Sequence, residues 1–129
     1  MAVKNSKTFE PKVKILKAKF ADMVAGERMA IGTPDMIASL IKSIPKGKEL
    51  SLSELRSKIA KKLDADVACP VTTSMYLKIA IEAEVQKQKT RFGFPFWRVV
   101  SENSKIFAKL SLPAQKIIRS KRASEDLFE

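Results

Sequence analysis

Few side chains in this sequence are suited to covalent chemistry. Cys69 is the single thiol, and the chain contains no His, the commonest general base and the commonest zinc ligand in proteins. A cysteine nucleophile needs a base or a cation beside it, and a lone cysteine is usually buried. One cysteine cannot form an intrachain disulfide. We therefore expect no catalytic residue, no metal site and no cofactor.

The charge of the chain is its most informative property. Lys and Arg total 25 against 14 Asp and Glu, which gives a net charge of +11 and a pI near 9.9. Basic side chains that neutralise phosphates release condensed counterions, so this surplus favours a nucleic-acid partner. The alternative is a solvated basic surface with no partner, or loose attraction to a membrane. No apolar run is long enough to span a bilayer, and we expect a cytoplasmic protein, nucleoid-associated in a prokaryote.

Two helices are predicted in the first half of the chain. Thr33 suits an N-cap and Pro34 the first helical position. Ser51 and Glu54 form a capping box for the second helix. The apolar residues of both follow helical spacing: Ile37, Leu40, Ile41 and Ile44 in the first, and Leu52, Leu55, Ile59 and Leu63 in the second.

A third helix is predicted from a cap at Thr72 or Thr73 to about Lys87. Its expected inner face consists of Met75, Ile79, Ala80 and Ala83. Its expected outer face consists of Thr73, Ser74, Tyr76 and Lys78, of which Tyr76 also suits a half-buried position.

The segment after the third helix is rich in β-prone residues. Phe94–Val100 and Lys105–Ala108, separated by a turn at 101–104, predict a β-hairpin, and a short helix follows near 113–119. The fold class expected is therefore α+β, a winged helix-turn-helix with a three-helix core, a β-hairpin wing and a short C-terminal helix. In that layout the third helix enters the major groove. The predicted organisation is a basic, partly disordered arm at 1–30, a DNA-binding domain at 31–120 and a polar tail at 121–129.

Four short motifs carry a family resemblance. They are Thr33-Pro34, Ile44-Pro45-Lys46-Gly47-Lys48, Ser53-Glu54-Leu55 and Pro95-Phe96-Trp97-Arg98-Val99-Val100. In order and rough spacing they resemble the C-terminal domain of the methylguanine–DNA methyltransferases, and Asp66–Thr73 is similar to a segment of one subgroup. The resemblance covers about two-thirds of the chain. It implies a winged helix that binds DNA through the minor groove and flips a base out of the stack.

The departures from the family pattern bear on activity. Phe96 stands where the family has its nucleophilic Cys, and Trp97 where it has the activating His. A Phe cannot accept an alkyl group. Leu52 replaces the family's Tyr, Ser74 its intercalating Arg, and 110–112 lacks its two glycines. Alkyltransferase-like proteins also lack the Cys, carry a Trp in its place, bind alkylated DNA and recruit repair factors.

The expected function is therefore DNA binding by a non-catalytic relative of the alkyltransferases that recognises damaged or distorted DNA. Double-stranded DNA is the expected partner, with a repair protein as a second. A winged-helix regulator or chromatin protein without lesion preference is the alternative. An enzyme with an unrecognised site is a third reading, against which the missing Cys–His pair argues.

Ten residues are candidates for contact with nucleic acid. Trp97 either stacks on a base or closes the core, and Arg98 either braces a pocket or forms a structural ion pair. The basic N-terminal arm either follows a phosphate backbone or only solubilises the chain. The full set is Lys46, Lys48, Thr72, Thr73, Ser74, Tyr76, Lys78, Trp97, Arg98 and Lys105.

Overall fold

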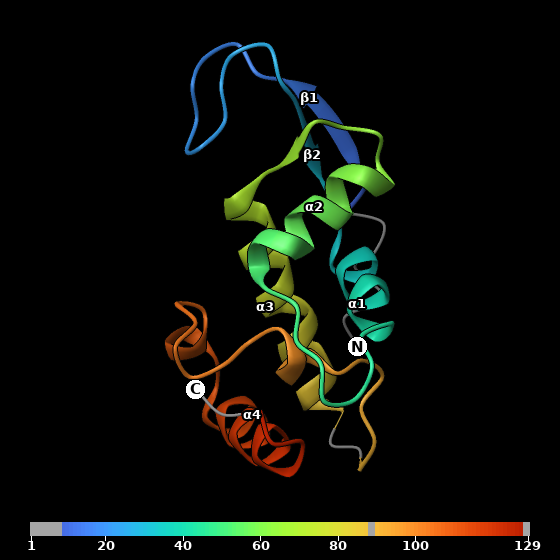
Figure 1. The fold of residues 1–129 in the computed structure, drawn as a ribbon, viewed down its shortest axis with the longest axis vertical. Helices are drawn as coiled ribbons and strands as arrows, with labels where there is room; N and C mark the ends of the chain where they lie inside the picture. The colour runs from blue at the N-terminus through green and yellow to red at the C-terminus, as the bar shows by residue number, and fades with distance from the viewer. Residues whose placement is uncertain (1–8, 88–89, 128–129) are drawn as a thin grey trace.

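The computed structural model describes residues 9–87 and 90–127, and it is an α+β fold. A small sheet lies at one end of the molecule and helix α4 at the other (Figure 1). In chain order the elements are β1 (Lys12–Ile15), β2 (Arg28–Ile31), α1 (Pro34–Lys42), α2 (Leu52–Lys62), β3 (Val67–Ala68), α3 (Pro70–Gln86), the 3-10 turns η2 (Phe96–Arg98) and η3 (Phe107–Lys109), and α4 (Leu112–Ser124).

The first two helices begin where their caps predict. The Thr33 side chain accepts a hydrogen bond from the Met36 amide, and Pro34 opens α1. Ser51 and Glu54 form both bonds of the capping box of α2, each close to 3 Å. These local signals act within one turn, so they are readable from sequence.

The start and the inner face of α3 differ from the prediction. The cap is Cys69, whose Sγ accepts from the Thr72 amide at 3.5 Å, and Pro70 takes the first helical position. Met75, expected inside, is 47% exposed. The buried face is instead rotated about the helix axis from the predicted one. It comprises Thr73, Leu77, Ala80, Ile81 and Glu84.

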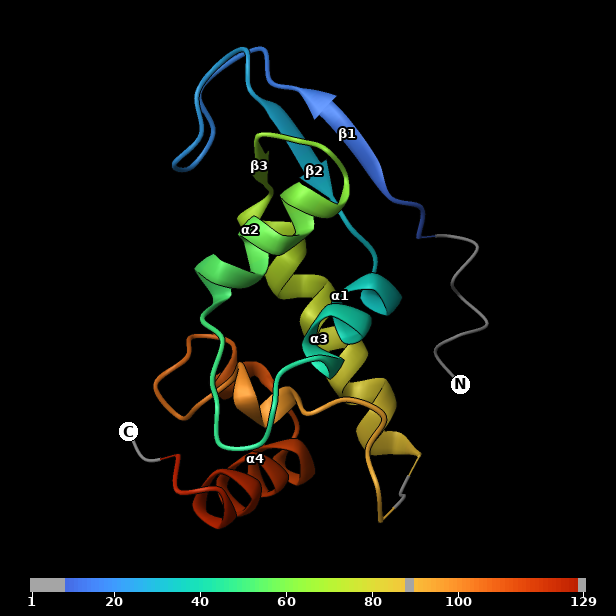
Figure 2. The same ribbon diagram turned by 45° about the vertical axis from the view of Figure 1, so that its right-hand side comes forward.

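The sheet occupies part of the segment that we predicted to be a partly disordered arm. β1 pairs with β2 in antiparallel fashion, with Val13 opposite Ala30, and β2 pairs with β3 in parallel, with Ala30 opposite Ala68. Figure 2 shows β1 at the outer edge and a long loop that joins it to β2. The arm prediction is therefore wrong for these strands, whereas Lys4 and Lys7 lie outside the described residues.

The predicted wing at 94–108 is wrong. That segment forms the 3-10 turns η2 and η3 and connecting loops, and it contributes no strand to the described sheet. Phe94, Phe96, Trp97 and Val100 are all buried, so the segment has no alternation of inner and outer faces. Its aromatic residues pack edge to face, with Phe96 5.6 Å from Phe94 and 5.3 Å from Trp97.

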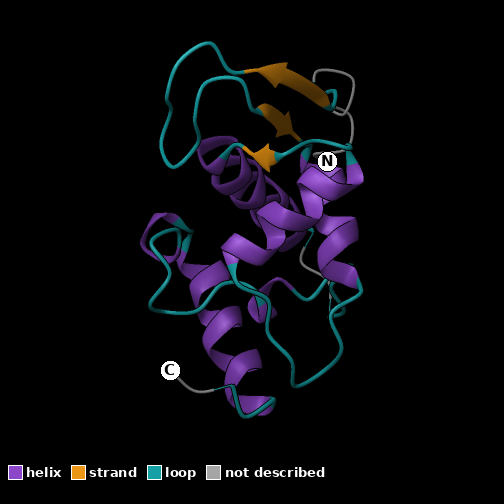
Figure 3. Cartoon of the chain, turned by 45° about the horizontal axis from the view of Figure 1, so that its top comes forward, coloured by secondary structure: helices purple, strands orange, loops and turns teal. Residues whose placement is uncertain are grey.

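Helix α4 extends past the helix predicted at 113–119. It runs to Ser124, with Ser111 as N-cap, and both Arg122 and Leu127 are buried. The predicted polar tail beginning at 121 is therefore wrong, because α4 continues to Ser124. Figure 3 shows the helices and 3-10 turns joined by long loops, with the short strands at one end. No helix within the described ranges combines the length and the apolar character needed to cross a bilayer.

Candidate nucleic-acid interface

The first turns of α3 hold five of the ten candidate residues, but not all of them face outward. Thr73, expected outside, is 4% exposed, and its hydroxyl donates to the Cys69 carbonyl at 2.6 Å. Thr72 is half-buried. Its Oγ1 is enclosed and has no hydrogen-bond partner within the described ranges. Tyr76 is half-buried against Phe9, with the ring centroids 5.2 Å apart.

A stripe along α3 remains open to solvent opposite its buried face. Val71 is 58% and Met75 47% exposed, while Ser74, between them, and Lys78, one turn further on, are partly exposed. Residues three and four apart share one side of a helix, so these four side chains form one surface. We call Val71, Ser74, Met75 and Lys78 the α3 stripe.

Helix α2, which packs against α3, adds positive charge. Its exposed lysines are Lys58, Lys61 and Lys62, and the last two lie in its final turn. A chain of seven residues, 63–69, connects this last turn to the first turn of α3.

The other candidate lysines are on a different part of the molecule. Lys46 and Lys48 are exposed in the turn before α2, where the Gly47 amide donates to Glu125 Oε1 at 3.1 Å. This bond places the turn beside the end of α4, far from the sheet (Figure 1). Lys105 is exposed just before η3. The structure therefore does not gather Lys46, Lys48 and Lys78 into one cluster.

Trp97 and Arg98 are engaged inside the protein. Trp97 is 7% exposed and its indole N–H donates to Glu125 Oε2 at 2.8 Å. Arg98 bonds the same carboxylate through two nitrogens, at 2.9 and 2.7 Å, and donates to the Ile44 carbonyl at 2.7 Å. Trp97 therefore closes the core, and Arg98 forms a structural ion pair, as the second alternative for each residue predicted.

The Glu125 carboxylate is held ionised by this arrangement. The guanidinium of Arg98, with help from the Trp97 indole and the Gly47 amide, lowers the pKa of Glu125 from 4.5 to about 2, against the opposing effect of burial. The neighbouring Arg122 is also buried, donating to the Trp97 carbonyl and to Glu49. None of these acidic partners is predictable from local sequence.

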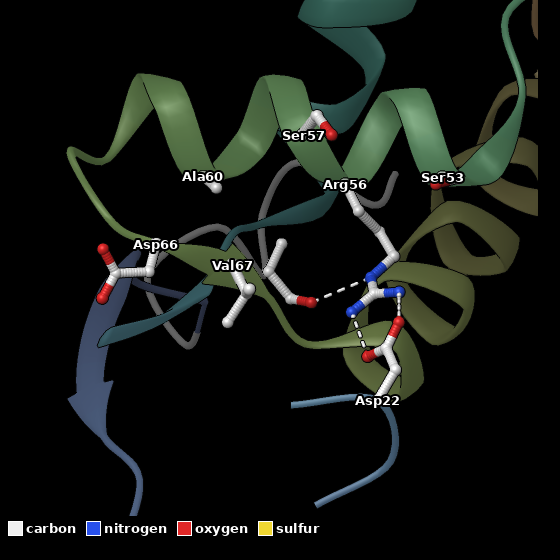
Figure 4. A pocket seen from close by; sticks show the side chains of 8 residues that line it. Asp22, Ser53, Arg56, Ser57, Ala60, Asp66 and Val67 are labelled. Atoms are coloured by element: carbon white, nitrogen blue, oxygen red, sulfur yellow. Dashed lines mark hydrogen bonds and ion pairs between the residues drawn. The ribbon is translucent and has the colours of Figure 1, made fainter. Parts of the chain in front are cut away.

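A second pairing that sequence reasoning missed fixes the loop between β1 and β2. Arg56 on α2 makes two bonds of 3.0 Å to the Asp22 carboxylate, and its Nε donates to the Ala68 carbonyl at 2.9 Å. Figure 4 shows Arg56 reaching between α2 and the loop, in a shallow pocket lined also by Ser53 and Ser57. Asp22 and Arg56 are 34 residues apart, and no spacing rule links them.

Two further observations concern covalent and metal chemistry in the described residues. Phe96, which the expected resemblance aligns with the acceptor Cys of the alkyltransferases, is fully buried. No group of His, Cys, Asp and Glu in the described ranges is arranged to hold a metal ion. Comparison with protein-family models, with curated proteins and with solved structures found no significant match.

Proposed function

We propose that this protein is a non-catalytic DNA-binding protein that places the α3 stripe against a duplex. The observation that carries the proposal is this open surface on a helix whose opposite side is buried, adjoining a helix rich in exposed lysines. Two packed helices, of which the second presents its first turns outward, form the reading unit of helix-turn-helix proteins.

The composition of the stripe suits a groove. Ser74 is a hydrogen-bond donor and acceptor, Lys78 is a cation, and Val71 and Met75 offer apolar contact to thymine methyl groups or sugars. No acidic residue lies in the first turn of α3. The positive end of the helix dipole is therefore not opposed by a carboxylate in that turn.

Damaged or distorted DNA is the preferred substrate in this proposal. Its support is the ordered resemblance of residues 33–100 to alkyltransferases, combined with the absence of an acceptor thiol at Phe96. A protein of this kind marks a lesion without repairing it, and a repair protein then acts as its partner. Alkyl transfer is no part of the proposed activity, because a phenyl ring has no nucleophilic atom.

A general duplex-binding protein, either a regulator or a chromatin protein, is the second candidate. The observation that favours it is the packing of Phe96 and Trp97, which are 0% and 7% exposed and fill the region where the family admits a flipped base. Such a protein would bind plain and alkylated duplexes equally.

Fluorescence anisotropy over a salt series tests both candidates. The probes are one labelled duplex, the same duplex with a single methylated guanine, and the same duplex with a one-nucleotide bulge. Tighter binding to the modified or bulged duplex supports the first candidate, and equal binding the second. No binding to any probe at low salt would remove both.

Two lysine variants locate the surface. Lys78→Ala should weaken binding and lower the slope of log affinity against log salt by about 0.9, the value for one phosphate contact. Lys116→Ala is the matched control, since Lys116 is exposed on α4 at the other end of the molecule. Equal losses in the two variants would mean that α3 is not the contact surface.

A further inference from the structure

The loop between β1 and β2 ends in a tight turn that is fixed to the rest of the protein. Phe20 and Met23 exchange backbone hydrogen bonds of 3.0 and 2.9 Å across Ala21 and Asp22. Met23 is fully buried, in a cluster with Met29 and with Cys69 at the start of α3. The turn therefore has a defined position beside the first turn of α3.

Asp22 gives the turn its second attachment. Its carboxylate pairs with Arg56, which also binds the Ala68 carbonyl just before α3 (Figure 4). The turn is thus held by an apolar anchor at Met23 and a charged one at Asp22. A side chain elsewhere on this turn is therefore held in a defined position.

Phe20 is the side chain so presented. It is 41% exposed, although its neighbour Met23 is fully buried. Among the aromatic residues in the described ranges, Phe20 is the one with no ring or cation contact. Its ring is available to a partner.

The charge around Phe20 is suited to phosphate. Lys17 and Lys19 are exposed on the approach to the turn. The acidic residue nearest to Phe20, Asp22, is paired with Arg56, whereas Glu27 at the far end of the loop accepts a hydrogen bond from the Val24 amide at 2.8 Å. An exposed ring beside free lysines has the make-up of a stacking platform for single-stranded nucleic acid.

We infer that Phe20 stacks on an unstacked base while Lys17 and Lys19 contact the adjoining phosphates. The inference rests on the proposed function and adds to it the element that distinguishes distorted from intact DNA. A paired and stacked base offers no free face to the ring, whereas a bulge, a mismatch or a single strand does.

The test compares Phe20→Ala with Ile15→Ala on three labelled probes: an intact duplex, a duplex with a one-nucleotide bulge, and a single strand of the same length. Ile15 is the matched control, an apolar residue of the same hairpin that is 68% exposed. Phe20→Ala should weaken binding to the bulged duplex and the single strand by roughly 5- to 150-fold, the range for loss of one aromatic platform. The salt slope should not change, because no charge is removed.

A spectroscopic variant reads the contact directly. Trp97 is the single Trp of the chain and is buried, so Phe20→Trp introduces an exposed indole at the turn. Its added emission should be quenched by the bulged duplex and much less by the intact duplex.

The outcomes separate the two proposals. Wild-type binding with no effect of Phe20→Ala and no quenching of Phe20→Trp would overturn the stacking role and leave the proposed function standing. An equal loss of binding to the intact duplex would also overturn it. So would a Phe20→Ala variant that keeps its binding to DNA and loses binding to anionic vesicles. Absence of wild-type binding to all three probes at low salt would remove the proposed function and the stacking role with it.

Discussion

Glu125, directly after helix α4, binds Arg98 through both carboxylate oxygens, at 2.9 and 2.7 Å. The pair is largely desolvated, with side chains 5% and 14% exposed. Removing one partner of a buried ion pair leaves the other charge without compensation. This pair therefore couples the stability of η2 to that of the end of α4.

Glu125→Gln should lower the free energy of unfolding at pH 7 by about 3 kcal/mol, the lower end of the range for a broken buried pair. Urea unfolding followed by circular dichroism measures the change. Glu102→Gln is the control, because the Glu102–Arg119 pair is exposed at 46% and 53%, and its loss should cost less than about 1 kcal/mol. Equal costs would contradict the central role of Glu125.

The same carboxylate predicts an acid-sensitive stability. Its pKa in the folded protein, about 2, lies below the ordinary 4.5. The unfolded chain therefore takes up a proton first as the pH falls, so the contribution of Glu125 is complete above about pH 4.5 and is lost towards pH 2. Urea midpoints measured from pH 7 to pH 2 should fall more steeply for the wild type than for Glu125→Gln.

Asp22→Asn should release the loop between β1 and β2 without unfolding the helical core. The variant loses the charged partner of Arg56, and local opening then becomes easier. Hydrogen exchange should accelerate at the Phe20 and Met23 amides, which bond across the turn. Glu10→Gln, an exposed change just before β1, should leave both rates as they are.

Cys69 should react with a thiol reagent only when the protein opens. It is 4% exposed and packs with Met23 and Met29. Labelling should be slow in buffer and fast in urea, and Asp22→Asn should accelerate it because Met23 covers the thiol. Rapid labelling of the native wild type would contradict the burial of this cluster.

Introducing a thiol at Phe96 should not confer alkyl transfer. Phe96 is fully buried against Phe94 and Trp97, and the chain has no His to activate a new Cys. Phe96→Cys should instead destabilise the fold by about 3 kcal/mol through lost packing. Intact-mass measurement after incubation with methylguanine DNA should show no added alkyl group, and a gain in mass would contradict the prediction.

The parts of the fold that sequence predicts are those whose cause is local. Thr33 and the Ser51–Glu54 box act within one helical turn, and both caps form as predicted. The alternation of lysines with Val13 and Ile15 also carries a strand signal of period two, which the high charge of the segment obscured. Pro45 and Gly47 correctly mark the turn that follows α1.

The errors arise where burial, not periodicity, decides the structure. Phe94 to Val100 resembles a strand because β-prone residues are also core residues. Pro95 lacks the backbone donor that a strand ladder needs. The amides of Val99 and Val100 instead donate to the Phe96 carbonyl within a local turn. The pairs Asp22–Arg56 and Arg98–Glu125 join elements far apart in sequence, and a single sequence gives no rule for finding such partners.

The contacts of Glu125 also constrain how the chain is made. Gly47 and Glu125 are 78 residues apart, and Arg122 binds Glu49 across 73 residues. During synthesis these bonds can form only after residues 122 and 125 have left the ribosome. The helix pair α1–α2, whose own contacts are closer in sequence, can pack earlier. The nascent protein therefore passes through a stage in which the turn at 45–50 and the aromatic residues of η2 have not yet bonded to Arg122 and Glu125.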